Sequence, residues 1–244
     1  MLEDKNVTQI SFHVVNPSNR RSTIARVPVP HSNLTLHTMD GSVKDNDIVC
    51  YDIIHNITTN STIGCAMYFE MVMDGYSEEK LTIMQSDMPG SASTSNLNIS
   101  LTIENGVVSL SLNRDGNYKS EVVLMEYKYY KSFQEVEGQR SGPYIFRPSE
   151  ADEIPTSYNN FTNYEVFNGK VVQQFILYGD QIDTVISINK FTDYVEIYTY
   201  LQGIPLSSQG QEVIIHFTFD QIVNNKTFYT DSMGLEMQKK DCRL

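Results

Sequence analysis

Apolar and polar residues alternate along much of this chain, and short turn sequences separate the alternating runs. The clearest case is the stretch 99–112, where every second residue is apolar on each side of the pair Asn105-Gly106. Side chains of a strand point alternately to its two faces, so this spacing puts the apolar residues of each run on one face. Because Asn-Gly between two such runs favours a two-residue turn, the sequence predicts an antiparallel hairpin here.

Similar runs predict strands in the rest of the chain. No stretch of twelve residues carries the spacing of an amphipathic helix, so we expect helix to be scarce. The chain is therefore predicted to be all-β. The further strands expected from the alternation span residues 10–16, 22–29, 48–54, 65–73 and 80–84, and later 171–177, 184–189, 194–201, 212–219 and 228–230.

One polar, turn-rich stretch divides the chain into two parts. Residues 85–96 read QSDMPGSASTSN and contain no apolar anchor for a packed element. Such a composition is typical of a linker, which we place at residues 87–97. We expect a small β-sandwich domain over residues 1–86 and part of a larger antiparallel β-domain over residues 98–244.

Composition and charge exclude several classes of protein. The 244 residues are 40% hydrophobic and 11% aromatic, which is too apolar for a disordered chain. The formal net charge of −12 leaves no basic cluster that could neutralise phosphates, so we predict no nucleic-acid partner. No apolar run approaches the roughly 20 residues that a membrane-spanning helix requires.

Glycosylation signals indicate a protein of the secretory pathway. Asn-x-Ser/Thr acceptor sequences are frequent, although the first residues carry neither the basic nor the apolar segment of a secretory signal. We interpret this combination as an internal fragment of a secretory protein. The predicted glycosylation sites are Asn6, Asn33, Asn56, Asn60, Asn98, Asn160 and Asn225.

The three cysteines allow one disulfide. Cys50 and Cys65 lie near the inner ends of two expected strands and could face each other across a hairpin. A bond between them would stabilise the fold by about 3 kcal/mol. The alternative is two buried free thiols. Cys242 is left over, and no cysteine spacing resembles a zinc site.

No cluster of titratable residues forms an active site by its spacing. None of the five histidines pairs with another His, Asp or Glu at the spacing of metal ligands. His13 and His216 lie within strand patterns and are most simply structural. The carboxylate clusters at 45/47, 78/79, 135/137 and 150/152/153 are expected to be solvated surface groups. The residues alone therefore describe a secreted-type β-protein without a self-contained active site.

Two longer motifs are more specific than any turn or cap. Residues 141–148 read SGPYIFRP, and residues 228–234 read FYTDSMG. They resemble the S-G-A-Y-[IL]-F-x-P and F-Y-T-D-x-N-G segments in the C-terminal β region of the lysosomal and Golgi-type α-mannosidases of glycoside hydrolase family 38. Weaker matches in the same order, such as FHVVNP at 12–17 and RVPV at 26–29, extend the resemblance along nearly the whole chain.

The resemblance implies part of a zinc-dependent retaining hydrolase of α-linked mannose in N-glycans. In this family the zinc ligands and the Asp nucleophile lie in an N-terminal domain that has no counterpart here. The chain itself would hold no catalytic residue, metal or cofactor, and alone would be inactive. Its larger part would belong to a supersandwich of the galactose-mutarotase type. Its partners would be the catalytic domain, the remaining C-terminal β region and mannose-containing glycans, in the lysosome or outside the cell.

The resemblance also assigns one residue to substrate binding. Tyr144 corresponds to a family tyrosine that points into the active site and hydrogen-bonds the bound sugar, with Ser141 and Gly142 supporting its approach. Pro143 replaces the usual Ala, which fixes φ and removes an N–H. The alternative is that Tyr144 is an ordinary strand aromatic. Arg147 and Asp231 are expected to be ion-pair or turn residues first and to support the site second.

A second class of function stays open on the sequence alone. Fifteen tyrosines and many polar loops would also suit a secreted carbohydrate-binding module or a cell-surface β-sandwich without catalysis. Tryptophan, a favoured platform for sugar rings, is absent. A glycan-binding assay separates the two classes.

Overall fold

A computed structural model shows an all-β molecule, and the residues it describes contain no helix. The scarcity of helix and the antiparallel sandwich architecture are as predicted. The structure describes residues 8–18, 22–51, 64–86, 98–113, 122–134, 140–141, 146–150, 152–189, 194–201, 203, 210–219, 222–223, 225–231 and 237–241. No helix in this described part could cross a membrane.

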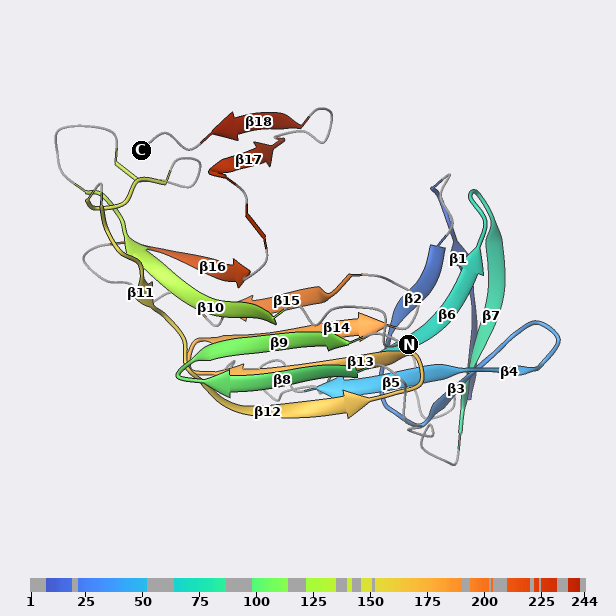
Figure 1. Cartoon of the computed structure of the whole chain (residues 1–244). Coiled ribbons are helices and arrows are strands. Elements are labelled where there is room, and N and C mark those ends of the chain that lie inside the picture. Colours follow the sequence, from blue (N-terminus) through green and yellow to red (C-terminus); the bar gives the residue numbers. More distant parts are fainter. Residues whose placement is uncertain are drawn as a thin grey trace.

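The first part of the chain forms a small sandwich of two antiparallel sheets, in blue and teal in Figure 1. Alternate residues of the two sheets point inward and pack around the fully buried Leu36, Phe69 and Leu81. One sheet has the order β1 (Gln9–Val15), β7 (Glu78–Gln85), β3 (Leu34–His37), β4 (Val43–Lys44), and the other has the order β2 (Ser22–Val29), β6 (Gly64–Met73), β5 (Asn46–Tyr51).

A disulfide joins the two neighbouring strands β5 and β6. Cys50 lies directly opposite Cys65 in the strand register, and the two sulfur atoms are bonded at 2.06 Å. Of the two alternatives for Cys50 and Cys65, a disulfide or two free thiols, the structure therefore shows the disulfide.

We expect the double substitution Cys50→Ser/Cys65→Ser to lower the free energy of unfolding by about 3 kcal/mol, because the bond closes a short loop and so lowers the entropy of the unfolded chain. The sequence separation of 15 residues sets this estimate. Urea denaturation of the oxidised chain and the double variant measures the difference. Cys242→Ser is the matched control, and equal midpoints for wild type and double variant would show that the bond contributes no stability.

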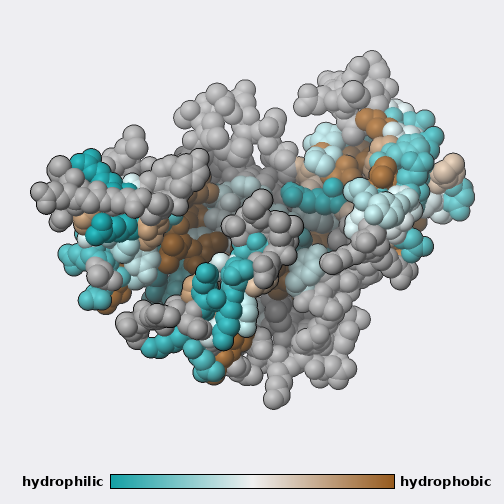
Figure 2. Space-filling view, turned by 90° about the horizontal axis from the view of Figure 1, so that it is seen from above, coloured by the Kyte–Doolittle hydropathy of each residue, from teal (hydrophilic) through white to brown (hydrophobic). Residues whose placement is uncertain are grey.

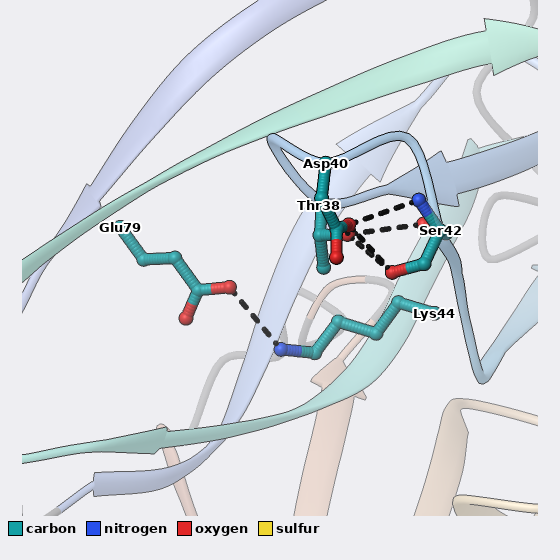
Figure 3. Close-up of polar contacts among 5 residues, drawn as sticks. All are labelled: Thr38, Asp40, Ser42, Lys44 and Glu79. Atoms are coloured by element: carbon teal, nitrogen blue, oxygen red, sulfur yellow. Dashed lines mark hydrogen bonds and ion pairs between the residues drawn. The ribbon is translucent and has the colours of Figure 1, made fainter.

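The turn between β3 and β4 is ordered by the carboxylate of Asp40 (Figure 3). Its Oδ1 atom accepts hydrogen bonds from the hydroxyl of Thr38 at 2.5 Å and from the backbone and side chain of Ser42 at 3.0 and 2.8 Å. Nearby, Lys44 Nζ lies 3.5 Å from Glu79 Oε1 and ties β4 to β7. The Thr38 hydroxyl, followed by Ser42, lowers the pKa of Asp40 to about 2.

The titration of Asp40 gives a pH-dependent prediction. Its pKa of about 2 in the folded chain lies below the ordinary value of 3.8, so its contribution to stability is present above about pH 4 and is lost as the pH falls toward 2. In the variant Thr38→Val we expect the pKa of Asp40 to move up toward 3.8. NMR titration of the carboxyl carbon measures this, with Ser32→Ala as a control, and an unchanged midpoint would remove Thr38 as the main cause.

The later part of the chain forms a second, larger sandwich. In its first sheet, β10 pairs with β9 and β11 along one edge and with β16 along the other. This sheet contains β8 (Asn98–Glu104), β9 (Val107–Asn113), β10 (Val122–Lys131), β11 (Thr156–Ser157) and β16 (Gln211–Phe219). The second sheet has the order β12 (Phe161–Asn168), β13 (Val172–Gly179), β14 (Ile182–Asn189), β15 (Glu196–Leu201). β17 (Thr227–Thr230) and β18 (Gln238–Asp241) form a separate pair.

The predicted Asn-Gly hairpin joins β8 to β9. Asn105 and Gly106 have φ values of 51° and 79°, the left-handed conformation that a two-residue type I′ turn requires at both positions. The hairpin places Val108 and Leu110 in the core of the larger sandwich, where they pack with Met125, Leu177 and other buried residues.

The two sandwiches pack against each other. The outer face of the β2–β6–β5 sheet contacts β13 and β14 through an apolar cluster that includes Val49, Tyr68, Val172, Ile176 and Val185. Polar groups reinforce this contact. Gln174 Nε2 donates a hydrogen bond to the Tyr68 hydroxyl at 3.0 Å, and the Arg26 guanidinium lies 5.8 Å from the ring centroid of Tyr68 and 5.4 Å from that of Tyr198.

At the edge of this contact, Asp47 binds the backbone of the larger sandwich. Its carboxylate accepts hydrogen bonds from the amides of Lys170 at 2.9 Å, Val171 at 2.5 Å and Val172 at 2.9 Å, and the residue is only 4% exposed. The expectation that the 45/47 pair is solvated is therefore wrong for Asp47, because its hydrogen-bond partners come from the turn before β13. It holds for Asp45, whose side chain is 67% exposed.

Candidate functional site

The first specific motif lies at the end of β10, and the structure describes its two flanks. Ser141 precedes the central residues of the motif and Arg147 follows them. The motif residues Gly142 and Tyr144 lie outside the described residues. The structure therefore describes the residues on either side of the segment 142–145. We call Ser141, residues 146–149 and the end of β10 with which they pair the base of the motif.

The Ser141 hydroxyl closes this base. Its Oγ atom donates a hydrogen bond to the carbonyl oxygen of Arg147 at 2.5 Å and accepts one from the Arg147 amide at 3.0 Å. Two residues that are six positions apart are thus held together by one side chain. Of the site residues expected from the sequence, the structure brings Ser141 and Arg147 together.

The returning strand of the motif runs antiparallel to the end of β10. Phe133 donates its amide to the Arg147 carbonyl at 3.0 Å, Ser149 donates to the Lys131 carbonyl at 2.8 Å, and an isolated bridge joins Ser132 to Pro148. The stretch that continues β10 is also paired on its other edge, because the Ser132 amide donates to the Gly210 carbonyl at 2.8 Å. The base is therefore part of the sheet and not a free loop.

Aromatic rings pack beneath the base. The Arg147 guanidinium lies 3.8 Å from the ring centroid of Phe133, which is 9% exposed, and the ring of Phe146 lies 5.6 Å from that of Tyr130. A cation over an aromatic face is an attractive contact. Arg147 was expected to be an ion-pair or turn residue, and the contact with Phe133 gives it a further structural role.

Glu153 belongs to the same base, which the sequence did not indicate. Its carboxylate accepts the Lys131 amide at 2.8 Å, the Ser149 amide at 3.1 Å and the Ser149 hydroxyl at 2.8 Å. The Lys131 amide, and to a lesser degree Ser149, hold the pKa of Glu153 below its ordinary value against the effect of desolvation. Glu153 is partly exposed, in keeping with the surface cluster expected here, but it also makes these structural hydrogen bonds. The only nearby residue that could have indicated this role is Ser149, whose hydroxyl lies four residues before Glu153 and binds its carboxylate.

The second specific motif lies on a different sheet. Phe228 and Tyr229 are on β17, which pairs with β18, and both are exposed. Asp231 follows directly after β17 and is half-buried.

One other polar cluster connects β10 and β16. Glu126 Oε1 lies 2.8 Å from His216 Nδ1 and 2.5 Å from Lys128 Nζ. Burial would raise the pKa of Glu126, but the hydrogen bonds from Lys128 and His216 outweigh it and hold the pKa below its ordinary value. This arrangement agrees with the structural role expected of His216.

Comparison with known protein families decides what the motifs indicate. The profile of the glycosyl hydrolases family 38 C-terminal domain matches residues 94–242, which is more than half of the chain. The chain belongs to glycosyl hydrolase family 38. The resemblance carried by residues 141–148 and 228–234 is thereby confirmed.

Two α-mannosidases are similar to this family 38 chain over nearly its whole length. The lysosomal α-mannosidase of Dictyostelium discoideum is 23% identical over 90% of the chain, and the α-mannosidase of Canavalia ensiformis is 24% identical over 98% of it. These matches cover 24% and 27% of the two relatives. The chain therefore spans about a quarter of the length of these curated relatives.

Solved structures show the same fold. An α-mannosidase from Enterococcus faecalis V583 aligns with 96% of the chain at a TM-score of 0.56 and 14% identity, covering 34% of that structure. A second family 38 protein from Enterococcus faecalis aligns with 95% of the chain at a TM-score of 0.59 and 13% identity, covering 35% of that structure.

The described residues of the family 38 chain do not fit a zinc ion. None of them form a group of three or more His, Cys, Asp or Glu side chains that could hold a metal. The nearest arrangement, Glu126 with His216, includes a lysine ammonium on the same carboxylate oxygen and so offers no set of free donors. No step through zinc can be built on these residues.

Three of the predicted glycosylation acceptors of the family 38 chain are exposed. Asn33, Asn160 and Asn225 are exposed, and Asn98 begins β8. Asn225 has a φ of 48° and lies in the turn that enters β17. The predicted acceptors Asn6, Asn56 and Asn60 lie outside the described residues.

Proposed function

We propose that this chain is the non-catalytic β portion of a zinc-dependent retaining α-mannosidase that acts on N-glycan α-mannosides. Its membership of family 38 and its similarity to α-mannosidases support the reaction class. The zinc ion and the nucleophile would be supplied by the part of the enzyme that lies outside these residues. The chain would help to wall the active site.

The observation that carries the proposal is the closed base at Ser141 and Arg147. Hydrogen bonds from one hydroxyl fix both flanks of the segment 142–145 against the end of β10. A segment with fixed flanks can present a side chain to a neighbouring domain at a defined position. We propose that Tyr144 is this side chain and that its phenol, a neutral donor and acceptor, orients a sugar hydroxyl. Gly142, Arg147 and Asp231 would support the site.

Substitution of Tyr144 in the complete enzyme tests this role. We expect Tyr144→Phe to lower kcat/KM for an aryl α-mannoside by about tenfold or more, because one hydrogen bond to the sugar is lost. Tyr76→Phe is the control, since Tyr76 is 77% exposed in the turn between β6 and β7. Unchanged kinetics with an intact fold would return Tyr144 to the role of an ordinary strand aromatic.

The isolated chain provides a second test. With added zinc it is expected to release no chromophore from an aryl α-mannoside, since it holds neither the proposed metal ligands nor the nucleophile. Turnover above the blank would contradict the proposal that the zinc ion and the nucleophile lie outside this chain. Binding of mannose glycans by the isolated chain without hydrolysis would instead favour a carbohydrate-binding module.

We also propose a compartment of the secretory pathway, lysosomal or extracellular. The Cys50–Cys65 disulfide and the exposed acceptors Asn33, Asn160 and Asn225 support it, because disulfides persist and N-glycans are added in such compartments. A shift in mass after peptide N-glycosidase treatment of the enzyme from its own cells tests the proposal. Absence of any glycan on all three acceptors would contradict it.

A further inference from the structure

One edge of β10 changes its pairing partner between Tyr129 and Lys131. As far as Tyr129 this edge is paired with β11, and beyond Lys131 the returning residues 146–149 pair with the continuation of β10. Residues 150–155 connect these two partners in the sequence. Glu153 lies on this connection and therefore next to the point where the partner changes.

Lys131 and Ser149 meet at this point but do not form a regular antiparallel pair. In a regular hydrogen-bonded pair, the two residues exchange both of their N–H···O bonds. Here the Ser149 amide donates to the Lys131 carbonyl at 2.8 Å, whereas the Lys131 amide donates to Oε1 of Glu153, also at 2.8 Å. One carboxylate oxygen thus takes the place that a backbone carbonyl has in a regular pair.

The second oxygen of the same carboxylate holds Ser149. Oε2 of Glu153 accepts the Ser149 amide at 3.1 Å and the Ser149 hydroxyl at 2.8 Å. A carboxylate is suited to this position because it has two acceptor oxygens and binds backbone N–H groups more strongly than a neutral acceptor does. We call the contacts of Glu153 with Lys131 and Ser149 the carboxylate clamp. It joins the residue at which the chain leaves β10 to the residue at which it returns.

The carboxylate clamp is the first contact of a short ladder that leads to the base of the motif. After it come an isolated bridge and the hydrogen bond from the Phe133 amide to the Arg147 carbonyl, and the Ser141 hydroxyl then binds Arg147. This ladder lies at the left end of the molecule in Figure 1, and Figure 2 shows hydrophilic surface at that end, in keeping with the partial exposure of Glu153. The flanks of the segment 142–145 are therefore held by the whole ladder.

We propose that Glu153 is a positioning residue of the proposed mannosidase site, because the carboxylate clamp fixes the flanks of the segment 142–145. The inference rests on the proposed function in one respect, that this segment presents Tyr144 to a bound sugar. A substrate-binding side chain is effective only when its surroundings hold it within about 0.5 Å of the productive position. Glu153 acts through Lys131 and Ser149, so its loss should weaken the contact with the sugar without removing a catalytic group.

Hydrogen exchange in the complete enzyme tests the carboxylate clamp itself. In Glu153→Ala the Lys131 amide is expected to exchange about tenfold faster, since it loses its acceptor. Glu150→Ala is the matched control, because Glu150 lies on the same connection and is exposed, and it should leave this exchange rate unchanged. An unchanged rate in Glu153→Ala would overturn the inference.

Kinetics with an aryl α-mannoside test the positioning role. Glu153→Ala is expected to raise KM about fivefold with little change in kcat, because the weakened sugar contact is made in the substrate complex and in the transition state alike. A variant that merely unfolds more readily would instead lower the apparent kcat and keep KM. Glu153→Gln retains one acceptor oxygen and is expected to bring KM back to within about twofold of the wild-type value.

A double-mutant cycle with Tyr144→Phe separates the inference from the proposed function. If Glu153 acts through the segment that carries Tyr144, Glu153→Ala should not raise KM further once the Tyr144 hydroxyl is absent. An equal rise in KM in both backgrounds would overturn the inference. If Tyr144→Phe alone leaves the kinetics unchanged, the proposed function fails. Faster exchange of the Lys131 amide in Glu153→Ala would in that case still support the carboxylate clamp.

Discussion

Replacing Asp47 by alanine is expected to lower the free energy of unfolding by about 4 kcal/mol, which is a large fraction of the stability of a typical domain. The carboxylate is buried and is the acceptor for three consecutive backbone amides of residues 170–172. Removing it leaves these donors without an acceptor at the contact between the two sandwiches, and an unsatisfied buried donor costs about 1–3 kcal/mol.

The neighbouring Asp45 provides the control for this prediction. Its carboxylate lies 3.3 Å from Lys170 Nζ, but its side chain is 67% exposed. Because exposed ion pairs contribute little, Asp45→Ala is expected to cost no more than about 0.5 kcal/mol. Urea denaturation of both variants measures the difference. Equal losses for Asp45→Ala and Asp47→Ala would show that the three amides are satisfied in some other way.

Much of the fold could be predicted because its signals are local. The hairpin of β8 and β9 follows from Asn105-Gly106, whose two residues adopt the turn conformation by themselves. Other strands carried weaker signals. β3 has only four residues, and β12 is partly or fully exposed along its length, so neither shows a long alternation. β10 does alternate, since the buried Met125 and Tyr127 are each followed by a charged residue, although the expected strands did not include it.

The candidate site was predictable only where its contacts are short in sequence. Ser141 and Arg147 belong to one motif and are joined within six residues. Asp47 and its partners are separated by more than 120 residues, so nothing near Asp47 in the sequence distinguishes it from the solvated Asp45. Glu153 combines both cases, because it binds Ser149, four residues before it, and Lys131 at the end of β10, 22 residues before it. The charge pattern of a sequence therefore predicts a solvated carboxylate correctly only where no distant backbone segment packs against it.

Gly169 should be as sensitive as Asp47, and for the same reason. A Cβ atom at Gly169 would lie 2.2 Å from Asp47 Oδ2 and 2.3 Å from its Cγ, far inside van der Waals contact. We expect Gly169→Ala to push the carboxylate away from its three amides and so to cost about 4 kcal/mol, as much as removing the carboxylate. Its φ is not in the left-handed region, so the cost comes from the collision and not from backbone strain.

A double-mutant cycle separates this collision from any other effect of the new methyl group. In the Asp47→Ala background the obstructing atoms are gone, and Gly169→Ala should then cost less than about 1 kcal/mol, giving a coupling of about 3 kcal/mol. In the Asp45→Ala background Gly169→Ala should keep its full cost. Chemical denaturation of the four chains of each cycle gives these values. Additive losses in the Asp47 cycle would contradict the prediction. They would mean that the turn before β13 shifts as a unit in Gly169→Ala, so that Asp47 still accepts the three amide hydrogen bonds.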